Sequence, residues 1–224
     1  MATQKLSCLR PKLPYARDNG TFFGREGDLE WIHQSFMERH IIAIHGLGGV
    51  GKTRLAVEYI YAYERDYDAI FWANADTNDT MTLSFVSMAQ QLVDCESKVF
   101  AEDTPRPGAD FTSMARHRNL TDHHDIILTN ATERVVSAVI SWLSDSLENW
   151  LLVLDNADDL ESVHLRSFFP AAASYRILIT SRNPNSHQFG IGHEIPSLSE
   201  EAAVRLLLEK VGKEGEGRSI HAPF

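Results

Sequence analysis

Four glycines, a lysine and a threonine stand close together in this chain, at a spacing that suits phosphate binding. Residues 41–53 read IIAIHGLGGVGKT and fit the pattern G-x-x-x-x-G-K-[ST]. The glycines allow successive backbone N–H groups to turn inward around phosphate oxygens. Lys52 supplies a positive charge for the outer phosphates, and the Thr53 hydroxyl is a suitable magnesium ligand. The sequence therefore predicts a site for a nucleoside di- or triphosphate with Mg²⁺.

The alternative interpretation of this stretch is a glycine-rich turn that happens to precede a lysine. The apolar run before the glycines predicts a strand, and the pattern after them predicts an amphipathic helix, which is the context that a phosphate loop requires. We therefore favour phosphate binding. The loop residues that we expect to contact the nucleotide are Gly46, Gly48, Gly49, Val50, Gly51, Lys52, Thr53 and Arg54.

The rest of the chain alternates between strand and helix patterns, which predicts an α/β fold with a mainly parallel sheet. Short apolar runs predict strands at 41–44, 69–73, 150–154 and 176–180, with a weak fifth at 194–195. Helical spacing of apolar residues occurs at 28–39, 53–65, 83–93, 135–147 and 203–211. Asp28 is expected to cap the first of these helices.

Three of the predicted strands end next to polar residues. The phosphate loop follows the first strand, Asp155 ends the third, and Arg182 follows the fourth. Ligands of such sheets lie at the carboxyl ends of the strands, so we expect these residues to converge. Asp155 has the form of a Walker B aspartate that holds magnesium, although an aspartate can also simply begin a turn. Arg182 can reach a terminal phosphate or be an exposed loop arginine.

Two further carboxylates, Asp158 and Asp159, follow the Walker B position closely. They can orient a water molecule for attack on a phosphate. They can equally be residues at a helix N-terminus, placed there against the helix dipole. The sequence leaves both interpretations open.

The composition excludes several classes of protein. With a formal net charge of −10 over 224 residues, the chain lacks the basic surface of a general nucleic-acid binder. No apolar run has the length of a membrane span, and the first twenty residues contain no apolar leader. Cys8 and Cys95 make no disulfide framework and no metal-ligand spacing, which favours a reducing, cytoplasmic setting.

The domain organisation that we expect has one main unit. Residues 1–20 form a mobile tail, and 21–197 form the nucleotide-binding domain with an insertion at about 96–127. Residues 198–211 are expected to be the first helix of a further, truncated helical subdomain. The glycine-rich, charged segment 212–224 is expected to be a disordered tail.

Several short motifs occur in an order that resembles a known family. They are Phe23-Gly24-Arg25-Glu26, Gly46 to Thr53, Phe71-Trp72, Leu151 to Asp155, Ile179 to Arg182 and Leu198 to Ala202. This set resembles the NB-ARC nucleotide-binding domain of STAND-type signal-transduction ATPases, a group of NLR-like signalling proteins. The amino-acid sequences of these motifs are most similar to those of NB-ARC domains of fungal proteins.

The resemblance implies a three-layer P-loop NTPase fold with strand order 5-1-4-3-2, followed by the start of a small helical subdomain. It implies that Phe23, Gly24 and Arg25 lie against the adenine, and that Arg182 is a sensor of the γ-phosphate. The implied activity is an ATP/ADP switch with slow Mg²⁺-dependent hydrolysis that controls assembly in immune or cell-death signalling. The implied partners are ATP or ADP, further copies of the chain and other NB-ARC proteins, with no nucleic acid and no membrane.

The chain also departs from the family pattern. Asn156 stands where a second aspartate often follows the Walker B residue, which points the expected water-orienting role towards Asp158 or Asp159. The catalytic residues that we expect are Asp155, Asp158 and Arg182. Later motifs that hold ADP from the other side have no counterpart. An inert truncated fragment that acts as an interaction module or decoy is therefore the alternative, and a P-loop kinase or fast ATPase is a less favoured one.

Overall fold

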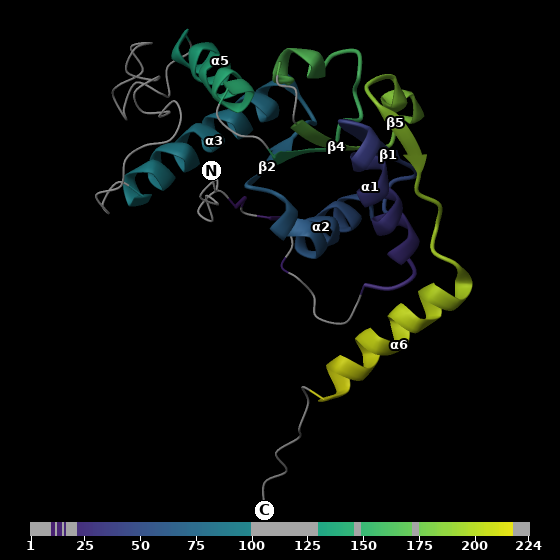
Figure 1. The fold of residues 1–224 in the computed structure, drawn as a ribbon. Helices are drawn as coiled ribbons and strands as arrows, with labels where there is room; N and C mark the ends of the chain where they lie inside the picture. The colour runs from purple at the N-terminus through teal and green to yellow at the C-terminus, as the bar shows by residue number, and fades with distance from the viewer. Residues whose placement is uncertain are drawn as a thin grey trace, which may run out of the picture.

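The computed structural model describes residues 10–11, 13–14, 16, 22–99, 130–145, 149–171 and 175–216. Most of the predicted N-terminal tail (1–20) and of the predicted insertion (96–127) lies outside these ranges, as does the end of the predicted C-terminal tail. The described residues form a sheet between two layers of helices, with one further helix projecting from it (Figure 1).

The sheet has five parallel strands in the order β2-β3-β4-β1-β5. Their bounds are Ile41–His45 (β1), Ala69–Asn74 (β2), Trp150–Asp155 (β3), Tyr175–Ser181 (β4) and Ile191–Glu194 (β5). Read from the other edge, this is the predicted order 5-1-4-3-2, so the predicted P-loop NTPase fold is confirmed. The strand that precedes Arg182 lies between the phosphate-loop strand and the Walker B strand.

The pairing register aligns the carboxyl ends of the three central strands. His45 at the end of β1 pairs with Ser181 at the end of β4. Leu154, next to the last residue of β3, pairs with Ile179 of β4. The residues that follow these strands therefore begin at the same edge of the sheet, as the rule for parallel sheets requires.

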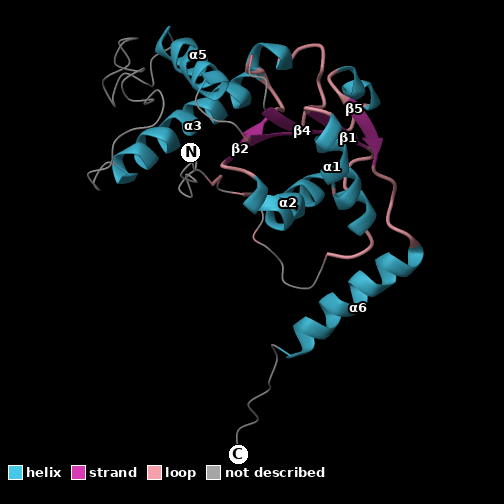
Figure 2. Cartoon of the chain, in the orientation of Figure 1, coloured by secondary structure: helices cyan, strands magenta, loops and turns pink. Residues whose placement is uncertain are grey.

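Helices cover both faces of the sheet, as Figure 2 shows. Their bounds are Glu26–Glu38 (α1), Lys52–Tyr63 (α2), Asn78–Val99 (α3), Asn130–Asp145 (α5) and Glu200–Glu216 (α6). One buried apolar cluster joins α1 and α2 to the sheet, and a second joins α3 and α5 to its other face. Five of the six residues of β3 are buried, because a central parallel strand is covered on both sides.

Several predicted boundaries differ from the structure by a few residues, and two of them concern the edge strand and the last helix. β5 covers Ile191–Glu194 rather than 194–195, because this edge strand is partly exposed and has no continuous apolar run to mark it. α6 reaches Glu216, beyond the predicted end at residue 211. Its start agrees with the sequence, since the Ser199 hydroxyl accepts a hydrogen bond from the Ala202 N–H.

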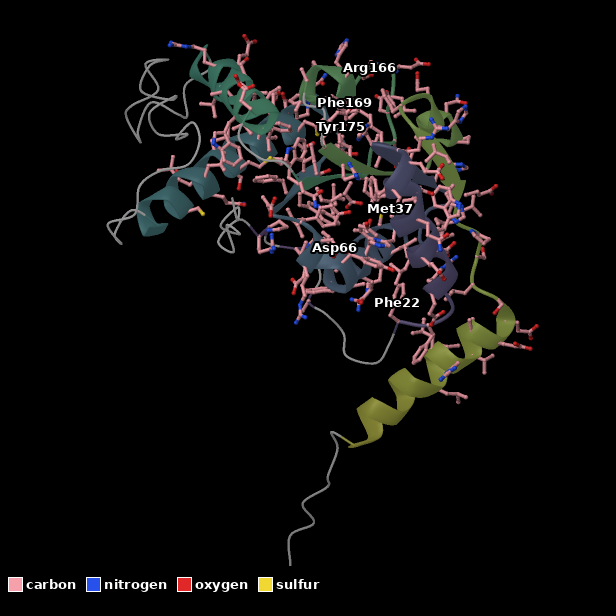
Figure 3. All side chains as sticks on the ribbon, in the orientation of Figure 1. Phe22, Met37, Asp66, Arg166, Phe169 and Tyr175 are labelled. Carbon is pink, nitrogen blue, oxygen red and sulfur yellow. The ribbon has the colours of Figure 1, made fainter. Side chains whose placement is uncertain are left out.

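The side chains in Figure 3 fill the space between the sheet and its helices. A hollow lies at the amino ends of β1, β4 and β5. This hollow has a volume of about 440 Å³. Its lining includes Tyr175 of β4, labelled in Figure 3, together with Arg39, His40 and Phe189. It lies at the opposite edge of the sheet from the phosphate loop, so it is separate from the site that the sequence predicts.

Two findings bear on the setting of the chain. Among the described residues, no helix is both long and apolar enough to cross a membrane. The expectation about cysteines is wrong, because Cys95 of α3 is disulfide-bonded. Disulfide pairing cannot be deduced from the spacing of two cysteines alone. The sequence-based argument from reduced thiols for a cytoplasmic setting therefore does not stand.

Candidate functional site

The phosphate loop joins the end of β1 to the start of α2. Gly46 has a φ of 152°, and a Cβ there would lie 2.5 Å from the carbonyl oxygen of Ile195. Gly51 precedes α2 with a φ of 99°, in the left-handed region that favours glycine. No described side chain caps the start of α2, so its first N–H groups point into the loop and suit an anion.

Lys52, the first residue of α2, is buried within this loop. Its ammonium donates to the carbonyl oxygens of Gly46 and Leu47, each at 2.8 Å. Burial lowers the pKa of Lys52, while the nearby carboxylates of Asp158 and Asp155 act in the opposite direction. The positive charge thus lies where the sequence pattern predicts it, close to two carboxylates.

Asp155, at the end of β3, accepts two hydroxyl hydrogen bonds at one oxygen. Thr53 Oγ1 donates to Asp155 Oδ1 at 2.9 Å, and Thr180 Oγ1 donates to the same atom at 2.6 Å. Burial raises the pKa of Asp155, and the two hydroxyls and Lys52 partly offset that rise. The predicted pair of Thr53 and Asp155 is therefore brought together by the fold.

Thr53 and Asp155 fit a magnesium ion chemically. Both present oxygen atoms, which this hard cation prefers, and the two oxygens lie close enough to share one ion. Among the described residues, no group of three or more histidine, cysteine or acidic side chains is arranged to hold a metal ion. A site with one carboxylate and one hydroxyl suits Mg²⁺, since this ion keeps several waters and binds substrate phosphates.

Thr180 is a site residue that sequence reasoning missed. Besides its bond to Asp155, it accepts a hydrogen bond from the Asn156 N–H at 3.0 Å. It thereby joins the end of β4 to the end of β3. Its position two residues before Arg182 was a signal, but only the pairing of these two strands shows that it reaches Asp155.

Arg182 lies beside the phosphate loop and is held by Asp158. Its Nε lies 3.1 Å from Asp158 Oδ2, and its backbone N–H donates to Asp158 Oδ1 at 2.6 Å. A Cβ built on Gly48 would lie 3.3 Å from Arg182 Cζ, which places the guanidinium against the loop. The structure thus brings Arg182 and Asp158 to the same edge as Lys52 and Asp155.

Asp159 and Asn156 have other contacts. The Asp159 carboxylate accepts backbone N–H bonds from Glu161 and Ser162, and these bonds lower its pKa. Asn156 has a φ of 68°, and its side chain donates to Asp76 in the loop after β2. Asp159 therefore organises a turn, and Asn156 ties two loops together.

Arg25 connects the phosphate loop to the chain after β5. Its buried guanidinium donates to the carbonyl oxygens of Val50 at 3.2 Å and Pro196 at 2.6 Å. It also pairs with Asp28, which in turn lies 2.8 Å from Nε2 of His193. The expectation that Asp28 caps α1 is wrong, because the helix begins at Glu26 and Asp28 lies inside its first turn.

The remaining candidate residues lie around the edge of this site. Phe23 contacts α6, where the guanidinium of Arg205 lies 4.5 Å from its ring centroid. Gly24 has a φ of 71°, and a Cβ there would lie 2.9 Å from Ala202 Cβ. Arg54 pairs with Glu58 and donates to the carbonyl of Ala16, so its guanidinium is directed to the N-terminal segment.

Comparisons with known proteins agree with this geometry. The family description "NB-ARC domain" matches residues 25–217. A nucleotide-binding leucine-rich repeat (NLR)-like protein of Hyaloscypha variabilis is 24% identical over 225 residues, covering 89% of this chain. The chain spans only 20% of that relative's length.

The fold is shared with a solved structure. A Walker-type ATPase of Pyrococcus abyssi has a TM-score of 0.53 at 13% identity, over 90% of this chain and 60% of that one. A STAND protein with a tetratricopeptide repeat sensor from Pyrococcus horikoshii has a TM-score of 0.48 at 19% identity. The match covers 85% of this chain and 26% of that one. Because the NB-ARC match covers most of the chain, this protein belongs to the NB-ARC family of nucleotide-binding P-loop domains.

Proposed function

We propose that this chain is the ATP/ADP-binding switch module of a STAND-type, NLR-like signalling protein. In this proposal it hydrolyses ATP slowly in the presence of Mg²⁺, and the bound nucleotide controls conformation and assembly. Lys52 and the loop N–H groups hold the phosphates, Thr53 and Asp155 hold the metal, and Arg182 senses the γ-phosphate. The adenine contacts of Phe23, Gly24 and Arg25 belong to the same proposal.

The observation that supports this proposal best is the hydrogen bond between Thr53 and Asp155. These residues are 102 positions apart in sequence, yet their oxygens lie 2.9 Å apart at the start of α2 and the end of β3. A glycine-rich turn with a chance lysine requires no carboxylate at this place. A magnesium-dependent phosphate site requires one.

Slow hydrolysis follows from the groups that surround this carboxylate. Asn156 is not a base, and its amide is hydrogen-bonded to Asp76. Asp158 uses both of its oxygens on Arg182. Neither group is arranged as a dedicated base for water, so turnover should lie far below the 1–100 per second that is typical of kinases.

Signalling in immunity or cell death, a cytoplasmic location and association with further NB-ARC chains belong to the same proposal and rest on family membership. One structural feature supports association. α6 projects from the domain (Figure 1) and exposes Val204, Leu207 and Leu208, with Leu208 68% exposed. Such apolar side chains favour contact with another chain or segment.

The test is the identity of the nucleotide that the purified protein releases on denaturation. Release of ADP in a molar amount close to that of the protein, together with slow Mg²⁺-dependent ATP turnover, would support the switch. No released nucleotide and no measurable affinity for ATP or ADP would instead favour an inert interaction module. Rapid turnover that depends on an added phosphate acceptor would favour a kinase.

A further inference from the structure

The ion pair of Asp158 and Arg182 lies beside the phosphate loop. We infer that Asp158 is a positioning residue, which aims the guanidinium of Arg182 at the terminal phosphate and thereby sets the preference of the site for ATP over ADP. This rests on the proposed function, because it assigns a role within the same nucleotide site. It differs from the role in orienting water that the sequence left open for Asp158.

The two residues meet at two places along the arginine. Asp158 contacts Arg182 twice, once at the backbone N–H (2.6 Å) and once at Nε (3.1 Å). These two contacts hold the arginine at its backbone and at the far end of its aliphatic chain. Within the described residues, the two terminal nitrogens of Arg182 have no recorded hydrogen-bond partner, so they remain available as donors to a phosphate.

The guanidinium of Arg182 is held beside the phosphate loop. It lies against Gly48 of the phosphate loop, at a distance where a Cβ on that glycine would be 3.3 Å from Cζ. Glycine at this position therefore leaves room for the arginine beside the loop. A cation here supplements Lys52 at the mouth of the site, where triphosphate and diphosphate differ.

The ion pair also limits the conformational freedom of Arg182. The Arg182 side chain is 66% exposed, so it would sample many rotamers without a partner. Holding such a side chain in advance avoids part of the entropy cost of binding. Asp158 is less exposed at 28%, and its carboxylate accepts the backbone N–H of Arg182, the residue directly after β4, so it can act as the fixed member of the pair.

Asp159 provides a matched control. It is the next residue along the chain and has the same charge, but its carboxylate binds the N–H groups of Glu161 and Ser162 instead of Arg182. Asp159→Asn removes one negative charge from the same loop and keeps an acceptor for that turn. This substitution changes the local charge but leaves the two contacts between Asp158 and Arg182 in place.

The experiment measures the affinities of wild type, Asp158→Asn, Asp159→Asn, Arg182→Gln and the Asp158→Asn/Arg182→Gln double variant for Mg-ATP and Mg-ADP by calorimetry. Loss of the ion pair should lower the ATP-to-ADP affinity ratio by about threefold or more in Asp158→Asn. Asp159→Asn should keep the wild-type ratio. The double variant should have the same ratio as Arg182→Gln, because Asp158 acts through the arginine.

The other outcomes overturn the inference. An unchanged ratio in Asp158→Asn with reduced ATP turnover would assign Asp158 to the attacking water. A higher ratio would mean that the carboxylate competes with the phosphate for Arg182 or repels it. A further fall in the double variant would mean that Asp158 acts directly on the nucleotide or its metal.

Failure of the proposed function looks different. Wild-type protein without affinity for either nucleotide would contradict the switch itself, whatever the variants do. If wild type binds both nucleotides and Arg182→Gln keeps the wild-type ratio, the sensor role of the arginine is wrong and the positioning role falls with it. Circular dichroism on each variant separates these results from loss of folding.

Discussion

Thr180 Oγ1, at the end of β4, donates a 2.6 Å hydrogen bond to Oδ1 of Asp155, at the end of β3. The same Thr180 oxygen accepts the N–H of Asn156, so one hydroxyl serves both residues at the end of the Walker B strand. Thr180 is buried, and the acidic side chain that it contacts is itself largely shielded from water. This hydroxyl therefore stabilises the position of the carboxylate that we assign to magnesium.

Thr180→Val should destabilise the domain by about 1–3 kcal/mol, because it leaves the Asn156 N–H without its partner and removes one of the two hydroxyl hydrogen bonds at Asp155 Oδ1. It should also weaken the dependence of ATP binding on Mg²⁺. Urea unfolding and calorimetric titration with and without the metal measure these two effects. Thr180→Ser keeps the hydroxyl and should resemble wild type; equal losses in both variants would point to packing of the methyl group instead.

Lys52→Ala should weaken binding of both ATP and ADP at least tenfold, about 1.4 kcal/mol, because the ammonium is the main positive charge within the phosphate loop. The fold should change little. Arg39→Ala is the matched control, since Arg39 lies at the amino ends of the strands beside the separate hollow. Equal nucleotide affinities in wild type and Lys52→Ala would contradict the assignment of this loop to phosphate binding.

Asp155→Ala should remove most of the enhancement of ATP binding by magnesium while affecting metal-free ADP binding much less. Thr53→Ala should act in the same direction. The comparison is between titrations in Mg²⁺ and in a chelator. Wild-type Mg-ATP affinity in Asp155→Ala would show that this carboxylate is not a metal ligand.

Alkaline pH should destabilise the domain through the buried pair of Tyr59 and Tyr67, whose hydroxyls lie 2.7 Å apart. Burial raises the pKa of Tyr67 to about 12, and it raises the pKa of Tyr59 as well. Above the ordinary tyrosine pKa of 10.0, the unfolded state therefore loses protons that the folded state retains. The free energy of unfolding should fall as the pH rises from 10.0 toward 12.

The Tyr59→Phe/Tyr67→Phe double variant removes both hydroxyls, so its stability should decline less steeply over this range. Near neutral pH the change should be small, because no unpaired hydroxyl is left behind. Urea unfolding at a series of pH values measures both effects. If the free energy of unfolding falls in parallel with pH in wild type and the double variant, other groups cause the loss of stability at alkaline pH.

Much of the phosphate site could be predicted without the structure, because it depends on local chemistry. Gly46, Gly51, Lys52 and Thr53 belong to one short segment, in which backbone conformation and spacing determine the loop. The convergence of Asp155 and Arg182 with that loop followed from the rule that parallel strands end at one edge. The strand order came from the resemblance to a family, since no local pattern determines which strands are neighbours.

The contacts that hold the polar groups in place were decided by tertiary structure alone. Thr180 reaches Asp155 because β3 pairs with β4, and Arg25 reaches Val50 and Pro196 because α1 packs beside the phosphate loop. Asp158 and Asp159 look alike in sequence, yet one holds Arg182 and the other caps a turn. Hydrogen bonds form at distances near 3 Å, and residues far apart in sequence reach that separation only once the strands are paired and the helices packed.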